Sequence, residues 1–157
     1  MARKSGLTPL WKKSDINKLF NKLEEKAEFV ILDLLYRTGE EFVKVARLEG
    51  QYKDHTGNLR SSIGYVIVRN GTIIGRNFQL SEKEGTDKKT GKREAEQLAM
   101  DLVSTYSTGY VLIGVAGMKY AAIVEAMENK DVLTRAAGRA DDFIKEHSRL
   151  LFKRLSI

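Results

Sequence analysis

The stretch Asp54-His55-Thr56-Gly57-Asn58-Leu59-Arg60-Ser61-Ser62-Ile63 decides the fold, because it separates a long helical pattern from a β-strand pattern. Thr and Gly are residues that favour turns, and the stretch leads directly into an apolar, β-branched run at 63–68. We expect Thr56-Gly57 to form the turn that releases the chain from the helix. Leu59 and Ile63 are then expected to anchor the start of the strand in the core.

The residues before this stretch carry the pattern of a long amphipathic helix. Ser14 is a candidate N-cap, and Gly50 ends the pattern. The helix is expected to span about 35 residues, or roughly 50 Å, either as one bent helix or as two that separate at Thr38-Gly39. The apolar positions recur at helical spacing: Ile16, Leu19, Phe20, Leu23, Ala27, Val30, Ile31, Leu34, Leu35, Phe42, Val43, Ala46 and Leu48.

A single small domain has difficulty covering a helix of this length. Part of its apolar stripe is therefore a candidate contact with a neighbouring subunit. The alternative is that the sheet and the last helix cover the whole stripe. The sequence leaves both alternatives open.

After the stretch, two β-rich segments at 63–68 and 72–80 flank Asn70-Gly71. Both central residues of a type I′ turn need positive φ, which Asn and Gly tolerate best. The pattern therefore predicts a β-hairpin with its turn at Asn70-Gly71.

The rest of the chain alternates between charged and apolar segments. Residues 81–93 contain no apolar residue and predict a mobile charged loop, and a short helix is expected at 94–106. The continuous apolar run at 110–116 predicts a centrally buried strand, which continues in a second segment at 120–126. Asp131 is expected to cap a closing helix.

Together these patterns predict an α+β fold. Its expected parts are a long N-terminal helix with a kink or break, an antiparallel sheet with a hairpin, a short helix and a closing C-terminal helix. Residues 1–13 are expected to form a flexible basic arm, and residues 14–157 a single domain.

Composition narrows the class of protein. The chain has no cysteine, which excludes a disulfide-stapled domain and a thiolate zinc site, and we expect an intracellular origin without an export signal. No apolar run approaches the roughly 20 residues needed to span a bilayer, so no membrane association is expected. The net charge is +6, and residues 1–26 carry seven Lys or Arg against three acids. That excess indicates an acidic partner or, alternatively, a solvated basic helix face.

The sequence shows no constellation typical of an active site, a metal site or a cofactor site. His55 and His147 are far apart, and neither has a second histidine at the spacing of metal ligands. Glu94 and Glu96 with Lys92 are the nearest match to a metal-dependent nuclease site, but they are expected at the edge of a flexible loop. We therefore predict no enzyme, no metal and no cofactor.

Two segments resemble one family of tailed-bacteriophage proteins. They are Thr56-Gly57-Asn58-Leu59-Arg60-Ser61-Ser62-Ile63 and, after Ile113-Gly114-Val115, Tyr120-Ala121-Ala122-Ile123-Val124-Glu125. The chain is similar in these segments and in the order of its elements to the tail-completion or neck proteins, which join head and tail in long-tailed phages and prophages. It departs from the family pattern after Glu125, where Ala126 stands and family members often have glycine.

The resemblance implies a structural, non-enzymatic protein made in the bacterial cytoplasm and built into the virion at the head–tail junction. It would act as a homo-oligomeric ring and contact other neck and tail proteins. The family-signature residues would be structural: Thr56, Gly57, Leu59, Arg60, Ser62, Ile63, Tyr120, Ala121, Val124 and Glu125.

Arg60 is expected to meet a carboxylate such as Glu125. The pairing would lie either within one subunit or between two subunits. The rival function is a basic nucleic-acid-binding module, with unspecific DNA contact through the basic arm and the start of the helix. Its candidate contacts are Arg3, Lys4, Lys12, Lys13, Lys18, Lys22 and Lys26.

Overall fold

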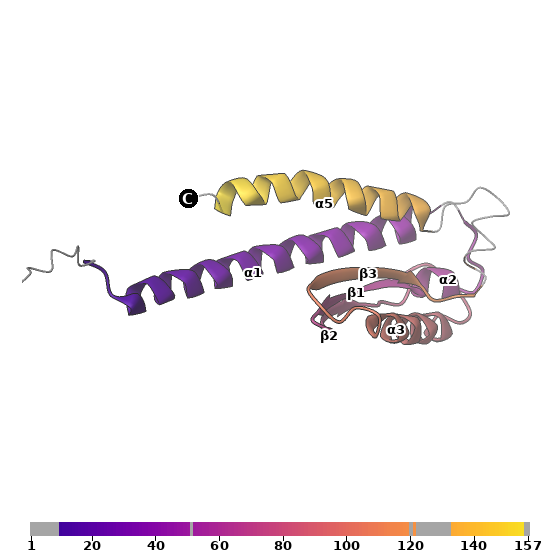
Figure 1. Ribbon diagram of the computed structural model, residues 1–157. Helices are drawn as coiled ribbons and strands as arrows, with labels where there is room; N and C mark the ends of the chain where they lie inside the picture. The colour runs from indigo at the N-terminus through magenta and orange to yellow at the C-terminus, as the bar shows by residue number, and fades with distance from the viewer. Residues whose placement is uncertain (1–9, 51, 120, 122–132, 156–157) are drawn as a thin grey trace, which may run out of the picture.

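The computed structural model describes residues 10–50, 52–119, 121 and 133–155. It has the predicted α+β class (Figure 1), with the element order α1 (Lys13–Lys44), η1 (Val45–Glu49), α2 (Asn58–Ser61), β1 (Ile63–Arg69), β2 (Thr72–Asn77), α3 (Lys89–Val103), β3 (Tyr110–Ala116) and α5 (Thr134–Leu155). Several predicted features lie outside the described residues: Arg3, Lys4, Tyr120, Val124, Glu125, the cap at Asp131 and most of the strand segment at 120–126. Ala121, the one described residue of that segment, is buried and helical, so the strand prediction is wrong at this residue.

The long helix runs without interruption through Thr38 and Gly39, so of the two alternatives the structure has one helix, and a separation into two helices at this point is wrong. Gly39 instead allows close packing, because a Cβ at this position would lie 2.7 Å from the ring of Tyr65. The irregularity comes later, where η1 is a short π-helical segment that ends at Glu49, with Gly50 as its C-cap. The N-cap prediction is also wrong: Lys12 rather than Ser14 is the N-cap, and among the described residues no side chain makes a capping hydrogen bond there.

The sheet is antiparallel with the strand order β2-β1-β3. Asn70 and Gly71 have φ values of 49° and 78°, as the predicted hairpin turn requires. The run at 110–116 is the predicted strand, but the central strand is β1 and β3 is hydrogen-bonded to β1 alone among the described strands. A continuous apolar run indicates that both faces of a strand are covered. It does not indicate whether that strand is central or at the edge in the hydrogen-bonded order of the sheet.

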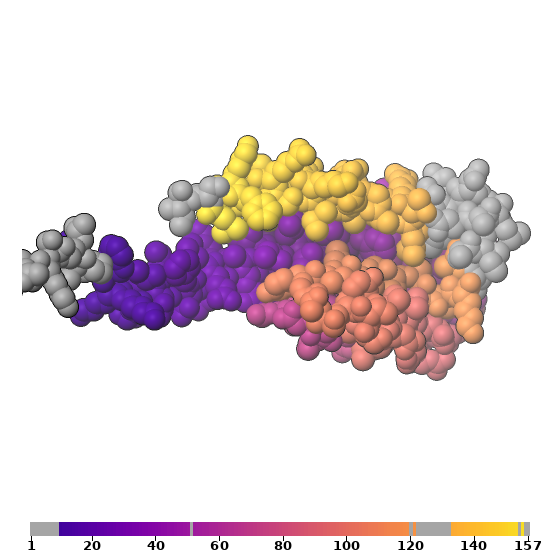
Figure 2. Space-filling model, in the orientation of Figure 1, coloured from indigo at the N-terminus to yellow at the C-terminus, as the bar shows by residue number. Residues whose placement is uncertain are grey.

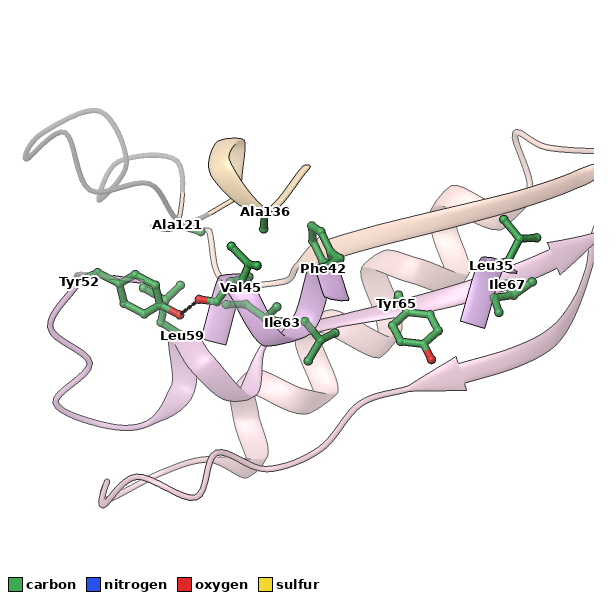
Figure 3. Close-up of a cluster of buried hydrophobic side chains, with 12 residues drawn as sticks. Leu35, Phe42, Val45, Tyr52, Leu59, Ile63, Tyr65, Ile67, Ala121 and Ala136 are labelled. Atoms are coloured by element: carbon green, nitrogen blue, oxygen red, sulfur yellow. Dashed lines mark hydrogen bonds between the residues drawn. The ribbon is translucent and has the colours of Figure 1, made fainter. Parts of the chain in front are cut away.

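Helices cover both faces of this sheet (Figure 1). α1 and α5 lie on one face, with α5 antiparallel to the second half of α1, and α3 lies on the other. The first face holds a core that includes Leu35, Phe42, Leu59, Ile63 and Tyr65, drawn in Figure 3. The second core joins α3 to the outer side of the same strands through Val66, Val68, Phe78, Ala95, Ala99, Val103, Ile113 and Val115.

α3 begins five residues before the predicted start and ends at Val103, so residues 89–93 of the predicted mobile loop are helical. The reason is that residues 54–62 supply hydrogen-bond acceptors to this region. Asn58 Oδ1 accepts from the Gly91 amide at 2.7 Å, and Asp87 donates its amide to the Thr56 carbonyl oxygen at 3.0 Å. Ser81 likewise donates its amide to Ser61 Oγ at 2.9 Å.

Candidate functional site

The junction segment, residues 54–63, is organised by the carboxylate of Asp54. This carboxylate accepts from the amides of Gly57 at 2.9 Å, Leu59 at 3.4 Å and Arg60 at 2.7 Å. These amides lie at the start of α2, where backbone N–H groups have no partner within the helix. Gly57 has φ +79°, a conformation that glycine adopts without strain. Asp54 and Gly57 together fix the turn that sequence analysis assigned to Thr56-Gly57.

Arg60 connects this turn to the end of the long helix. Its guanidinium donates to the carbonyl oxygens of Arg47, Gly50 at 3.0 Å and Tyr52 at 3.2 Å, and it stacks on the Tyr52 ring. The side chain is 5% exposed. Arg60 thus supplies donors to the carbonyl groups that a helix leaves unpaired at its C-terminal end.

Arg47 makes the second connection, from η1 to the sheet. Its Nε donates to the Ile63 carbonyl oxygen at 3.1 Å, and a terminal nitrogen donates to the Gln79 carbonyl oxygen at 2.7 Å. Burial lowers the pKa of Arg47 from its ordinary value, because the charged form loses solvation. The buried charge of each arginine is therefore stabilised by backbone carbonyl groups. Among the described residues neither arginine forms an ion pair with a carboxylate.

Two further side chains complete the junction. Tyr52 is 3% exposed, its hydroxyl donates to the Ala46 carbonyl oxygen at 2.9 Å (Figure 3), and burial raises its pKa to about 12. Asp87 lies on the surface side, where the hydrogen bond from Asn58, followed by those from Thr90, lowers the pKa of its carboxyl group. The junction is thus a dense hydrogen-bonded joint between three elements, and none of these groups is placed like a nucleophile with a base.

A pocket of about 450 Å³ opens beside the junction, between the end of α1, η1 and residues 79–83. Its lining combines apolar side chains with charged ones, of which Arg47 and Arg60 already donate to backbone carbonyl oxygens and Lys44 Nζ lies 3.7 Å from Glu41 Oε2. Glu40 on its wall is already engaged, since it accepts from the Tyr65 hydroxyl and from Asn77 Nδ2, each at 2.7 Å. The residues that set its character are Val43, Leu48 and Leu80, the cations Lys44, Arg47, Arg60 and Lys83, and the acids Glu40 and Glu82.

The second candidate site is the projecting segment of α1, residues 13–29. Figure 2 shows the start of α1 extending beyond α5 and beyond the sheet and α3, whereas Glu28, near the end of this segment, pairs with Arg69 of β1. No residue of α1 before Leu34 is buried, and Leu19 and Phe20 are 55% and 64% exposed. These residues belong to the stripe that packs against the sheet and α5 further along the helix. Between the two alternatives for the stripe, the structure shows that the sheet and α5 do not cover all of it: Leu19 and Phe20 are exposed, whereas Ile16, Leu23 and Ala27 are half-buried.

The structure brings three of the predicted basic contacts together on this segment. Lys18, Lys22 and Lys26 are exposed and follow one another at four-residue spacing, which places them along one side of the helix. None of the three makes an ion pair with a described residue. Lys12 and Lys13 lie exposed at the start of the helix, whereas Arg3 and Lys4 are outside the described residues.

Asp54, Arg47 and Tyr52 organise the junction, a role that the sequence pattern did not predict. A signal for Asp54 was present, since Asp placed before a Thr-Gly turn and a short polar segment is typical of a cap. Arg47 lies between Ala46 and Leu48, two positions of the predicted apolar stripe, and a charged residue at such a place indicates a buried charge. The expected Arg60–Glu125 pair stays a prediction, because Glu125 lies outside the described residues.

Other kinds of site find little support within residues 10–50, 52–119, 121 and 133–155. In these residues no helix is long and apolar enough to cross a bilayer, and no three His, Asp or Glu side chains gather as metal ligands would. His147 stacks on Phe143 at 3.9 Å between ring centres, and its Nδ1 lies 2.9 Å from the Phe143 carbonyl oxygen. Lys92 and Glu96 face each other across a turn of α3 at 4.0 Å.

No family model matches this sequence, and neither a search of curated proteins nor a search of solved structures returned a match.

Proposed function

We propose that this chain is a structural, non-enzymatic protein of a tailed-phage virion that completes the tail as a homo-oligomeric ring at the head–tail junction. The projecting segment of α1 carries the proposal. A helix whose apolar stripe extends past its own domain is incomplete as a monomer, and burial of that stripe against another copy removes it from water. The family signature at residues 56–63 and 120–125 adds the assembly context.

The junction gives such a ring subunit a rigid frame. Arg60, Arg47 and Asp54 tie the end of the long helix to the sheet, so a load on the projecting segment is passed to the whole domain. The signature residues serve this frame: Leu59 and Ile63 are at most 1% exposed, and Ser62 Oγ donates to the Leu59 carbonyl oxygen at 2.8 Å. The partner contacts then belong to the helix surface and the pocket rather than to the signature itself.

The deciding experiment is electron microscopy of particles assembled without the protein. We expect filled heads and separate tails, because the piece that closes the tail is missing. Normally joined virions would overturn the proposal. A complementing copy supplied in the cytoplasm of the producing cell should restore joined particles.

The second candidate is a basic nucleic-acid-binding module, favoured by the exposed column of Lys18, Lys22 and Lys26. It predicts DNA affinity that falls steeply with salt and is lost on removal of the basic arm. The variant Lys18→Gln/Lys22→Gln/Lys26→Gln should reduce the salt slope by about three counterions. A matched variant at Lys145, Lys153 and Lys89, which lie on other elements, should leave the slope unchanged if the helix is the contact.

A further inference from the structure

The two sides of the projecting segment differ in charge, and this difference specifies how copies pack together. With about 100° per residue, Ile16, Phe20, Leu23 and Ala27 lie along one apolar stripe. Lys22 and Lys26 lie toward one side of this stripe. Glu24 and Glu28 lie toward the opposite side.

We propose that the projecting segments of neighbouring copies pack in parallel and at the same level around the axis of the ring. The inference rests on the proposed ring and names the contact that closes it. The apolar stripes share one interface, and the lysine side of each helix meets the acidic side of the next.

Charge decides between the two directions of packing. When two helices pack antiparallel through the same stripe, equal sides meet, so Lys22 and Lys26 of one copy face the same lysines of the other. In a parallel pair, opposite sides meet, and the flanking charges then select the orientation as they do in coiled coils. Glu24 is exposed and available for this contact, whereas Glu28 already pairs with Arg69 of its own chain.

The symmetry of a ring also fixes the relative height of neighbouring helices along its axis. A closed ring relates its subunits by rotation without translation along the axis, so helices parallel to that axis bring residues of the same number to the same height. The stripe is also continuous with the face on which α1 packs against α5 and the sheet, starting at Leu34. The contact between copies thus extends a packing surface that the chain already uses.

Cysteine cross-linking tests this arrangement directly, because the chain contains no cysteine of its own. Ile16→Cys and Ala27→Cys place single thiols on the stripe, and they are separated by about 16 Å along the helix at the standard rise. The control Glu25→Cys places a thiol on the side away from the stripe. Each variant is oxidised alone and in a 1:1 mixture at the highest soluble concentration, and the cross-linked peptides are identified by mass spectrometry.

We expect 16–16 and 27–27 links, no 16–27 link in the mixture, and no link through residue 25. A 16–27 link would overturn the inference in favour of an antiparallel pair, and links no more frequent than those of the Glu25→Cys control would overturn it altogether. A second variant, Lys22→Glu/Lys26→Glu, should lose the links, and adding Glu24→Lys should restore them. These results do not depend on the particle experiment: normally joined virions would overturn the proposed function, and a 16–27 link would overturn this contact alone.

Discussion

The guanidinium carbon of Arg60 lies 4.4 Å from the centre of the Tyr52 ring, while its nitrogens donate to the carbonyl oxygens of Gly50 and Tyr52. One side chain of α2, directly before β1, therefore holds the end of a helix that began at Lys13. This contact explains why an arginine belongs in the junction segment: only a planar group with several donors reaches several carbonyl oxygens at once.

Arg60→Ala should be strongly destabilising. The substitution removes donors from the carbonyl oxygens of Arg47, Gly50 and Tyr52, and each buried acceptor left without a partner costs about 1–3 kcal/mol. We expect the free energy of unfolding to fall by at least about 2 kcal/mol, measured by urea denaturation followed by circular dichroism. Arg60→Lys should recover only part of this loss, because an ammonium group lacks the fork geometry.

The control is Arg69→Ala, which removes an exposed ion pair with Glu28 and should cost about 1 kcal/mol or less. An equal loss in both variants would contradict the proposed role of Arg60. Arg60→Ala also tests the pairing of Arg60 with Glu125 that the sequence predicts. If Arg60→Ala and Glu125→Ala have additive effects in a double-mutant cycle, the two residues are not coupled.

Asp54→Ala should destabilise the fold through the turn. The carboxylate accepts from three backbone amides at the start of α2, and loss of a capping side chain typically costs about 0.5–2 kcal/mol. Asp54→Asn keeps an acceptor oxygen and should cost less. The matched control is Asp33→Ala, which removes an exposed carboxylate that pairs with Arg37 across one helical turn. Thermal unfolding of the three variants should rank Asp54→Ala lowest.

The hairpin and the order of the elements could be predicted from the sequence, because both depend on local signals. Asn70-Gly71 needs positive φ, and the stripe from Ile16 to Ala46 repeats at helical spacing. The side chains at the end of the helix could not be assigned in the same way. Spacing placed Leu48 on the buried stripe, yet Leu48 is 67% exposed and Arg47 is 9% exposed. The π-helical segment η1 contains an additional residue per turn and so shifts which positions face the core.

The start of α3 shows a second limit of sequence reasoning. Residues 81–93 contain no apolar residue, and a local pattern of that kind predicts a loop. The helix nevertheless starts at Lys89, where Asp87 accepts from the Thr90 amide and Asn58, distant in sequence, accepts from the Gly91 amide. The pairing of β3 with β1 alone among the described strands is a similar case, since strand order depends on long-range pairing that no local window contains.

Stability should decrease in alkaline solution through Tyr52. Burial raises the pKa of its phenol to about 12 from an ordinary value near 10, so the unfolded chain loses this proton at lower pH than the folded chain does. The unfolded state then binds fewer protons than the folded state between about pH 10 and pH 12, and the free energy of unfolding falls through this window. A difference of two pKa units corresponds to roughly 3 kcal/mol. Burial also raises the pKa of Tyr65, which acts in the same direction.

The measurement is urea denaturation at pH 9 and at several values up to pH 11, which sample the start of the decrease. Tyr52→Phe should be less stable at pH 9, because it loses the hydrogen bond to the Ala46 carbonyl oxygen, but its stability should fall less steeply with pH. Tyr106→Phe, at a tyrosine that is 42% exposed, serves as the control for removal of a phenol. A slope that is the same in Tyr52→Phe and in the unsubstituted chain would contradict the assignment.

Replacement of two helical glycines by alanine should have opposite effects. Intrinsic helix propensity favours alanine over glycine by about 1 kcal/mol at an exposed interior position. Gly138 in α5 is exposed, and a Cβ there meets no atom within 4 Å, so Gly138→Ala should stabilise the fold by about 0.5–1 kcal/mol. Gly91 in α3 lies against the junction segment, where a Cβ would sit 2.1 Å from the Asn58 carbonyl oxygen.

Gly91→Ala should therefore destabilise the fold, because the backbone of Asn58 cannot move aside without disturbing the turn that Asp54 holds. Steric overpacking of this kind costs about 1–3 kcal/mol, which exceeds the gain in helix propensity. Urea denaturation of the two variants beside the unsubstituted chain gives the sign of each change. If both variants were stabilised, α3 would not be packed against residues 54–63, and the junction would have to be rigid without it.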